Sequence, residues 1–171
     1  MLFFGFFWAF FHGALSPAAE IGCIFPPEGI SAIPATEIPL FNTFLLIVSG
    51  ISLTWAHYSL SVNRMKNIID GFLITIFLGL LFVLLQIFEY YESEFSFSDS
   101  VYSCSFFMLT GLHGCHVIVG VSFLFVCFIR LTKRHYMINH YLGFVCAIWY
   151  WHFVDIVWIF LFFTVYLWGS A

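Results

Sequence analysis

The chain has 171 residues, of which 63% are hydrophobic and only 8% are charged, and its formal net charge is −4. This composition lacks the polar surface that a soluble domain presents to water, which excludes a soluble enzyme. Five Lys and Arg residues in total leave no basic surface for nucleic acid, and five Cys residues without a C-x-x-C spacing favour neither a disulfide framework nor a thiolate metal site.

The first uncharged run begins at Met1 and predicts a helix over residues 1–15, because Ser16-Pro17 should end it. Such a helix measures roughly 22 Å, which is shorter than a hydrocarbon core of about 30 Å. We therefore expect a partial span here. Residues 16–38 are rich in proline and contain three glutamates, so they should form an ordered loop outside the bilayer.

Four longer runs follow, and each is long enough to cross a membrane. They predict helices over residues 39–63, 71–92, 99–131 and 139–168. The expected fold is therefore an all-α polytopic membrane protein: a bundle of four full transmembrane helices plus one partial N-terminal helix, forming a single domain over residues 1–171.

The basic residues predict the orientation of this bundle. All five follow either the second or the fourth predicted helix, at Arg64, Lys66, Arg130, Lys133 and Arg134. The positive-inside rule places them on the cytoplasmic or matrix side, and it places the acidic loops on the opposite side.

Five ionisable side chains are expected at membrane depth, where burial costs a few kcal/mol or more: His57, His113, His116, His152 and Asp155. Two histidines at matched depth could hold a haem iron, and His113 with His116 could join Asp155 in a metal site. The favoured alternative is structural, because neutral histidines bond across helices and His152 lies one turn from Asp155. Accordingly, we expect no metal site and no catalytic residue in this chain.

Three glycines flank the histidines of the fourth predicted helix, at Gly111, Gly114 and Gly120. Small residues in a membrane helix are typical of close contact with another helix. They therefore favour helix packing over a cofactor pocket in this segment.

Several long motifs occur in order along the chain: GFFWAFFH at 5–12, TWAHYSL at 54–60, EYYE at 89–92, SDSVY at 98–102, TGLHGCHVIVG at 110–120 and WYWHFVDIVW at 149–158. Together they resemble subunit III of the mitochondrial and bacterial cytochrome c oxidases. The resemblance implies a helical bundle that holds no haem or copper, packs beside the catalytic subunit I and binds phospholipids. Haem and copper are then expected in partner subunits of complex IV.

The resemblance also implies roles for individual residues. Arg130 resembles a family arginine that meets a lipid phosphate, with Lys133 and His135 close by, and Trp8 resembles an aromatic residue that lines a lipid cleft. Topogenic charge and ordinary packing are the alternatives for these residues. For His152, which lies in the matching WHFVD segment, the implied role is structural.

The resemblance departs from the common seven-helix form of the family, because the match begins within the third of its seven helices. The first two helices have no counterpart in this sequence. A short first helix also leaves peptide groups without partners at membrane depth. We therefore expect a second polypeptide to supply those helices and to pack against residues 1–10.

The expected function is that of a non-catalytic core subunit III of a proton-pumping cytochrome c oxidase of aerobic respiration. It would stabilise subunit I and bind phospholipid in the mitochondrial inner membrane, since 25 Phe residues and few Lys residues suit an organellar gene. Two alternatives stay open: a bacterial quinol oxidase subunit III in the plasma membrane, and an independent membrane b-type cytochrome that uses His57, His116 or His152.

Overall fold

The computed structural model describes residues 2–17, 25–27, 33–62, 64–133 and 142–169, and the structural statements below concern these residues. They form α-helices and one π-helical segment, with no strand in these ranges. The helices are α1 (Leu2–Leu15), α2 (Ile38–Ser61), α3 (Met65–Glu92), α4 (Val101–Thr132) and α5 (Leu142–Leu161), and α5 continues into η2 (Phe162–Trp168).

Four of these helices are long and apolar enough to cross a membrane: α2, α3, α4 and the continuous segment Leu142–Trp168. The short apolar helix α1 is added to them. The prediction of an all-helical membrane bundle with four full spans and one partial N-terminal helix is therefore confirmed.

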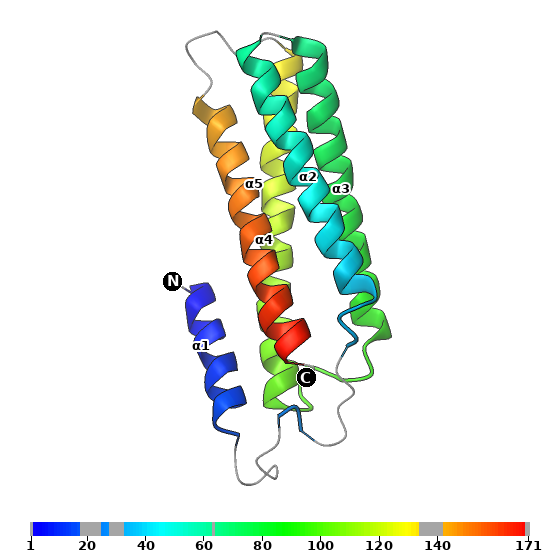
Figure 1. Ribbon diagram of the computed structural model, residues 1–171, viewed down its shortest axis with the longest axis vertical. Helices are drawn as coiled ribbons and strands as arrows, with labels where there is room; N and C mark the ends of the chain where they lie inside the picture. Colours follow the sequence, from blue (N-terminus) through cyan, green and yellow to red (C-terminus); the bar gives the residue numbers. More distant parts are fainter. Residues whose placement is uncertain (1, 18–24, 28–32, 63, 134–141, 170–171) are drawn as a thin grey trace.

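The four long helices run side by side and alternate in direction (Figure 1). The connection from α2 to α3 lies at the same end of the bundle as the C-terminal end of α4. The basic residues Arg64, Lys66, Arg130 and Lys133 therefore share one end. This arrangement agrees with the prediction that all basic residues lie on one side. That this end faces the cytoplasm or the matrix stays a prediction.

Helix α1 lies along only one half of the bundle, the half farther from the basic end (Figure 1). At 1.5 Å per residue its 14 residues measure about 21 Å, whereas the 32 residues of α4 measure about 48 Å. Helix α1 packs on α4, and its aromatic rings also contact α5 and η2. The ring centroids of Phe7 and Phe160 are 4.8 Å apart, and those of Phe11 and Trp168 are 5.5 Å apart. Helix α1 is thus held by aromatic contacts on one side.

Small residues allow the long helices to approach closely. A Cβ atom at Gly71 would lie 2.8 Å from the Cβ of Ala56, so α3 and α2 are in near backbone contact there. A Cβ at Gly79 would lie 2.6 Å from Cη2 of Trp151, which makes room for that fully buried indole. Association through small residues is typical of membrane helices, because apolar side chains gain little over lipid.

The helix bounds differ from the predicted ones mainly at α3, which begins at Met65 instead of residue 71. The prediction started this helix after Asp70 because it divided the sequence at charges, and this was wrong. Lys66 and Asp70 lie in the first turns of α3 at the end of the bundle, where polar side chains reach the membrane interface. The bounds at Leu15 and at Val101 agree closely with prediction, and the Ser100 Oγ atom caps α4 by accepting from the Ser103 N–H at 3.0 Å.

Candidate functional site

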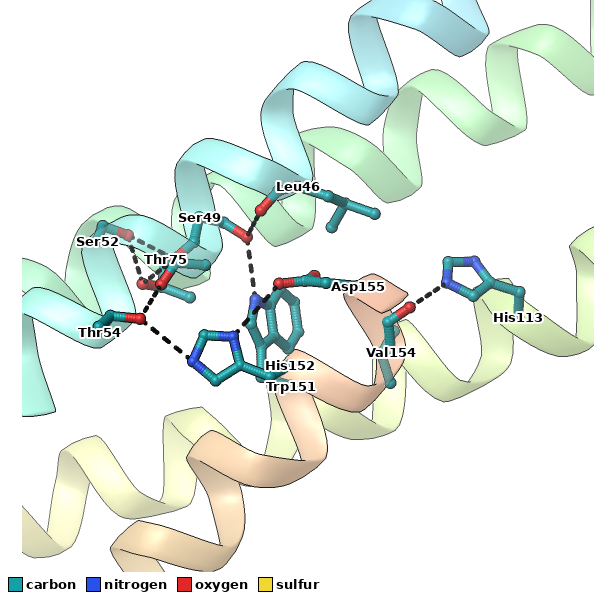
Figure 2. A network of polar contacts seen from close by, with 11 residues as sticks. Leu46, Ser49, Ser52, Thr54, Thr75, His113, Trp151, His152, Val154 and Asp155 are labelled. Atoms are coloured by element: carbon teal, nitrogen blue, oxygen red, sulfur yellow. Dashed lines mark hydrogen bonds and ion pairs between the residues drawn. The ribbon is translucent and has the colours of Figure 1, made fainter. Parts of the chain in front are cut away.

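A network of polar contacts lies about midway along α2, between α3 and α5 (Figure 2). The indole Nε1–H of Trp151 donates to the Ser49 Oγ atom at 3.0 Å, and the Ser49 hydroxyl donates to the Leu46 carbonyl at 2.7 Å. Trp151 is fully buried, so its N–H needs such a partner. This contact joins α5 to α2.

A second pair of hydroxyls joins α2 to α3 in the same network. The Oγ atoms of Ser52 and Thr75 lie 2.8 Å apart. The Ser52 hydroxyl also lies 2.8 Å from the Ser49 carbonyl, and the Thr75 hydroxyl lies 2.8 Å from the Gly71 carbonyl. Because each hydroxyl has one hydrogen, one of the two donates to the other hydroxyl, and the second donates to its backbone carbonyl.

His152 and Asp155 form the third part of the network. The Thr54 hydroxyl lies 2.8 Å from the Gly50 carbonyl and 3.3 Å from His152 Nε2. His152 Nδ1 faces Asp155 Oδ2 at 4.0 Å, which is beyond a direct hydrogen bond but within electrostatic reach. The two side chains lie near each other, as positions one turn apart on a helix must, but no direct hydrogen bond joins them, and the neighbour of His152 on α2 is Thr54.

Gly50 provides the space for this carboxylate. A Cβ atom at this position would lie 2.9 Å from Asp155 Oδ2. Sequence reasoning did not identify Ser49, Gly50 and Thr54 as part of the site. The available signal was the occurrence of small and hydroxyl residues within an apolar helix.

The other histidines lie apart from this network. His113 is buried, and its Nε2 atom lies 3.3 Å from the Val154 carbonyl, whereas its Nδ1 atom has no hydrogen-bond partner among the described residues. His116 Nδ1 donates to the Leu112 carbonyl at 2.8 Å. The half-buried ring of His57 lies 6.3 Å from that of Phe144.

The histidines therefore differ in their contacts, and no group of three or more His, Cys, Asp or Glu side chains in the described ranges is placed to hold a metal ion. His113 bonds to α5, while the His116 ring lies 6.3 Å from Phe3 of α1. The two histidines thus serve different helix contacts. Both contacts are of the kind that joins helices, and the expected absence of a metal site stays a prediction.

The glycines of α4 differ as well. A Cβ atom at Gly120 would lie 3.0 Å from the Trp151 ring, so the predicted close contact is confirmed there. A Cβ at Gly111 would approach only the Tyr90 hydroxyl, at 3.8 Å, and one at Gly114 would meet nothing within 4 Å. At Gly114 the predicted close contact is therefore absent within the part of the chain that the structure describes.

Three of the residues expected to bind lipid lie exposed on the described part of the chain. Trp8 is 77% exposed, so ordinary packing within the described part of the chain does not account for it. Arg130 lies exposed in the last turn of α4, with its Nη1 atom near Gly143 of α5, and Lys133 follows as the exposed C-cap. His135 lies outside the described residues. These positions suit lipid contact, which stays a prediction.

A further buried polar group, which sequence reasoning did not single out, lies near the other end of α3. The Tyr166 hydroxyl of η2 donates to Glu89 Oε1 at 2.7 Å, and Glu89 is only 2% exposed. One residue further on, the Tyr90 hydroxyl lies 2.7 Å from the Thr110 hydroxyl of α4. In the sequence, Glu89 stands out only as the first residue of the EYYE motif.

Comparison with known proteins agrees with the sequence motifs. Residues 1–170 match the family model of cytochrome c oxidase subunit III. The cytochrome c oxidase subunit 3 of Loxodonta africana is 52% identical over 170 residues, which are 99% of this chain and 65% of that relative. The Equus caballus relative of the same name is 53% identical over 168 residues, 98% of this chain and 64% of its own.

The chain therefore spans about 65% of the length of these curated relatives. The family match covers nearly all of the chain, and the identity extends over the same residues. The chain belongs to the cytochrome c oxidase subunit III family.

Proposed function

We propose that the chain is a non-catalytic core subunit III of a proton-pumping cytochrome c oxidase. Membership of the family carries this proposal, since the relatives are named as subunits of that complex. The structure supports a structural role, because the ionisable side chains near the middle of the bundle make helix-to-helix contacts, most clearly those of His152 to Thr54. The chemistry of oxygen reduction would then belong to haem and copper in partner subunits.

The proposed role within the complex is to stabilise subunit I and to present phospholipid to it. A broad apolar surface supports this, since large side chains such as Phe4, Trp8 and Trp149 are more than 70% exposed and need a lipid or protein neighbour. At the basic end, Arg130 and Lys133 would contact the phosphate of an anionic lipid. The proposed location is the mitochondrial inner membrane, with the acidic end toward the intermembrane space.

Affinity purification through a tag on the C-terminus tests this function. A haem-copper catalytic subunit should copurify in equal amount, and the purified complex should oxidise cytochrome c. Purification of the chain alone with stoichiometric haem would overturn the proposal in favour of a b-type cytochrome. Oxidation of quinol but not of cytochrome c would instead support the quinol oxidase alternative.

A further inference from the structure

The outer surface between α2 and α5 carries three polar side chains that no described element covers fully: Thr54, His57 and His152. Thr54 is exposed, His57 is partly exposed, and the side chain of His152 is 36% exposed. The Thr54 hydroxyl and His152 Nε2 lie 3.3 Å apart across the two helices (Figure 2). The imidazoles of His57 and His152 lie within electrostatic reach of each other. The three side chains therefore form one patch, which we call the α2–α5 polar patch.

This patch begins near the basic end of the bundle and extends into the membrane. At 1.5 Å per residue the span Leu142–Trp168 measures about 40 Å, and His152 lies about 15 Å from its first residue. Because the hydrocarbon core is about 30 Å thick, a centred span places His152 about 10 Å inside it. By the same reasoning Thr54, about 10 Å from the end of α2, lies about 7 Å inside, and His57 lies one turn nearer the boundary. Lipid headgroups therefore do not reach Thr54 and His152.

Other exposed polar side chains of the long helices are satisfied by their own helix. The hydroxyls of Ser61, Ser122 and Thr132 donate to backbone carbonyls three or four positions earlier, at 2.7, 2.8 and 2.9 Å. The imidazole of His57 differs from them, because among the described residues it has a ring contact with Phe144 at 6.3 Å but no hydrogen bond. The other three histidines of α2–α5 each have a hydrogen-bond contact. The patch therefore presents hydrogen-bonding groups that the described residues leave open.

The position of the patch determines what can cover it. Acyl chains offer no hydrogen-bond partner, and a polar group left without one in hydrocarbon costs several kcal/mol. Water on this outer surface would have to stand in the hydrocarbon itself. A second transmembrane helix is the cover that fits, because Ser, Thr, Asn and Gln side chains hydrogen-bond between helices in membranes.

The chemistry of the imidazole indicates which side chain that helix should present. A neutral imidazole has one donor nitrogen and one acceptor nitrogen. A hydroxyl or a carboxamide likewise both donates and accepts, whereas Lys and Arg only donate and carry a charge that is costly at this depth. A hydroxyl or carboxamide group therefore complements the patch best.

Large side chains surround the polar groups on the same surface. Ile51 and Tyr58 lie one turn on either side of Thr54, and residues at this spacing share a helix face. Ile156 lies one turn beyond His152, and all three of these large side chains are more than 60% exposed. A mainly apolar helix with one polar group would thus find matching contacts along this surface.

We propose that the α2–α5 polar patch is the docking site for a transmembrane helix of another subunit of the complex, which supplies a hydroxyl or carboxamide side chain to His57 and His152. This inference rests on the proposed function and deepens it, since it names the surface through which the chain is held in the complex. The apolar side chains around the patch would give the contact area, and the polar groups would set the register of the two helices.

Photo-cross-linking in the intact purified complex tests the docking site. The photoreactive residue p-benzoylphenylalanine in place of Ile156 should cross-link to one other subunit, within a transmembrane segment that carries Ser, Thr, Asn or Gln. The same residue in place of Phe77, which is 66% exposed on α3, is the matched control and should not reach that segment. Cross-links from position 156 to lipid alone, or to another part of this chain, would overturn the docking site.

The same experiment separates this inference from the proposed function. Purification of the chain without any other subunit would overturn both of them. An intact oxidase complex in which position 156 reaches no other subunit would overturn the docking site only.

His57→Phe measures what the open imidazole contributes to docking. The rate at which the chain leaves the detergent-solubilised complex should rise roughly threefold, as expected for the loss of one hydrogen bond between membrane helices. His57→Gln keeps a donor and an acceptor and should restore most of the retention. Ser122→Ala removes an exposed hydroxyl that bonds to its own helix, so it is the matched control and should leave the rate unchanged. Equal rates for His57→Phe and the unmodified complex would overturn the proposal.

Discussion

The middle of the bundle and its acidic end both bury polar side chains, but they satisfy them differently. In the middle, Trp151 finds Ser49 at 3.0 Å, and Ser52 finds Thr75 at 2.8 Å, each across a helix interface. At the acidic end, Glu89 has a partner for one oxygen only, and Asn42 has none among the described residues. The indole and hydroxyl groups of the middle therefore join α2, α3 and α5 and specify how these helices pack. Asp155 Oδ1 in the middle, and Glu89 Oε2 and Asn42 near the acidic end, are instead buried without a hydrogen-bond partner among the described residues.

The largest loss of stability should follow from removing a buried side chain in the middle of the bundle. Trp151→Ala removes a fully buried indole and its hydrogen bond to Ser49, which should destabilise the chain by about 3–5 kcal/mol. The amount of assembled complex and its thermal dissociation temperature should both fall. Trp149→Ala, on the same helix but 72% exposed, is the control and should change neither quantity much. Similar losses in the two variants would mean that the middle is not the source of stability.

A smaller loss is expected from Gly50→Ala. The added Cβ atom would lie 2.9 Å from Asp155 Oδ2, so the carboxylate or the helix must shift, at a cost of about 1–3 kcal/mol. Gly114→Ala is the matched control, because a Cβ there meets nothing within 4 Å and alanine favours the helix. Thermal dissociation of the complex should be lowered by the first change only. Equal tolerance of both changes would contradict the close packing at Asp155.

Thr54→Val tests the hydrogen bond to His152 with little change in shape. Loss of this partner should cost about 1 kcal/mol, which is typical of one hydrogen bond between membrane helices. Thr54→Ser keeps the hydroxyl and should restore most of the stability. The measurement is the thermal dissociation temperature of the complex, which should be lower for Thr54→Val than for Thr54→Ser. Equal temperatures for the two variants would show that the Thr54 hydroxyl does not stabilise the contact with His152.

The smallest effect on stability is expected on the surface outside both regions. Arg130→Gln should leave thermal dissociation nearly unchanged, because the side chain is exposed. It should reduce the anionic phospholipid that copurifies with the complex and shorten its working life during turnover. Lipid analysis by mass spectrometry measures the first effect. An unchanged lipid content would leave Arg130 with only a topogenic role.

The spans were predictable from the sequence because an uncharged run of sufficient length has one outcome in a bilayer, and the end of α1 at Leu15 followed from Ser16-Pro17. The partners within the bundle were not predictable. Ser49 and Trp151 lie 102 positions apart, and nothing local to either residue indicates the other. Glu89 marked the end of a run in the sequence, yet it is buried, because Tyr166 approaches from η2, 77 positions away.

The central proposal is that this chain stabilises an oxidase without taking part in its chemistry. Selective removal of the chain from the purified complex tests it most directly, with the haem content, the initial rate of oxygen reduction and the lifetime during turnover measured before and after. The account predicts unchanged haem and a nearly unchanged initial rate, but faster inactivation that is reversed when the chain is added back. Loss of haem in step with the chain, or an initial rate that falls in proportion to it, would contradict the account.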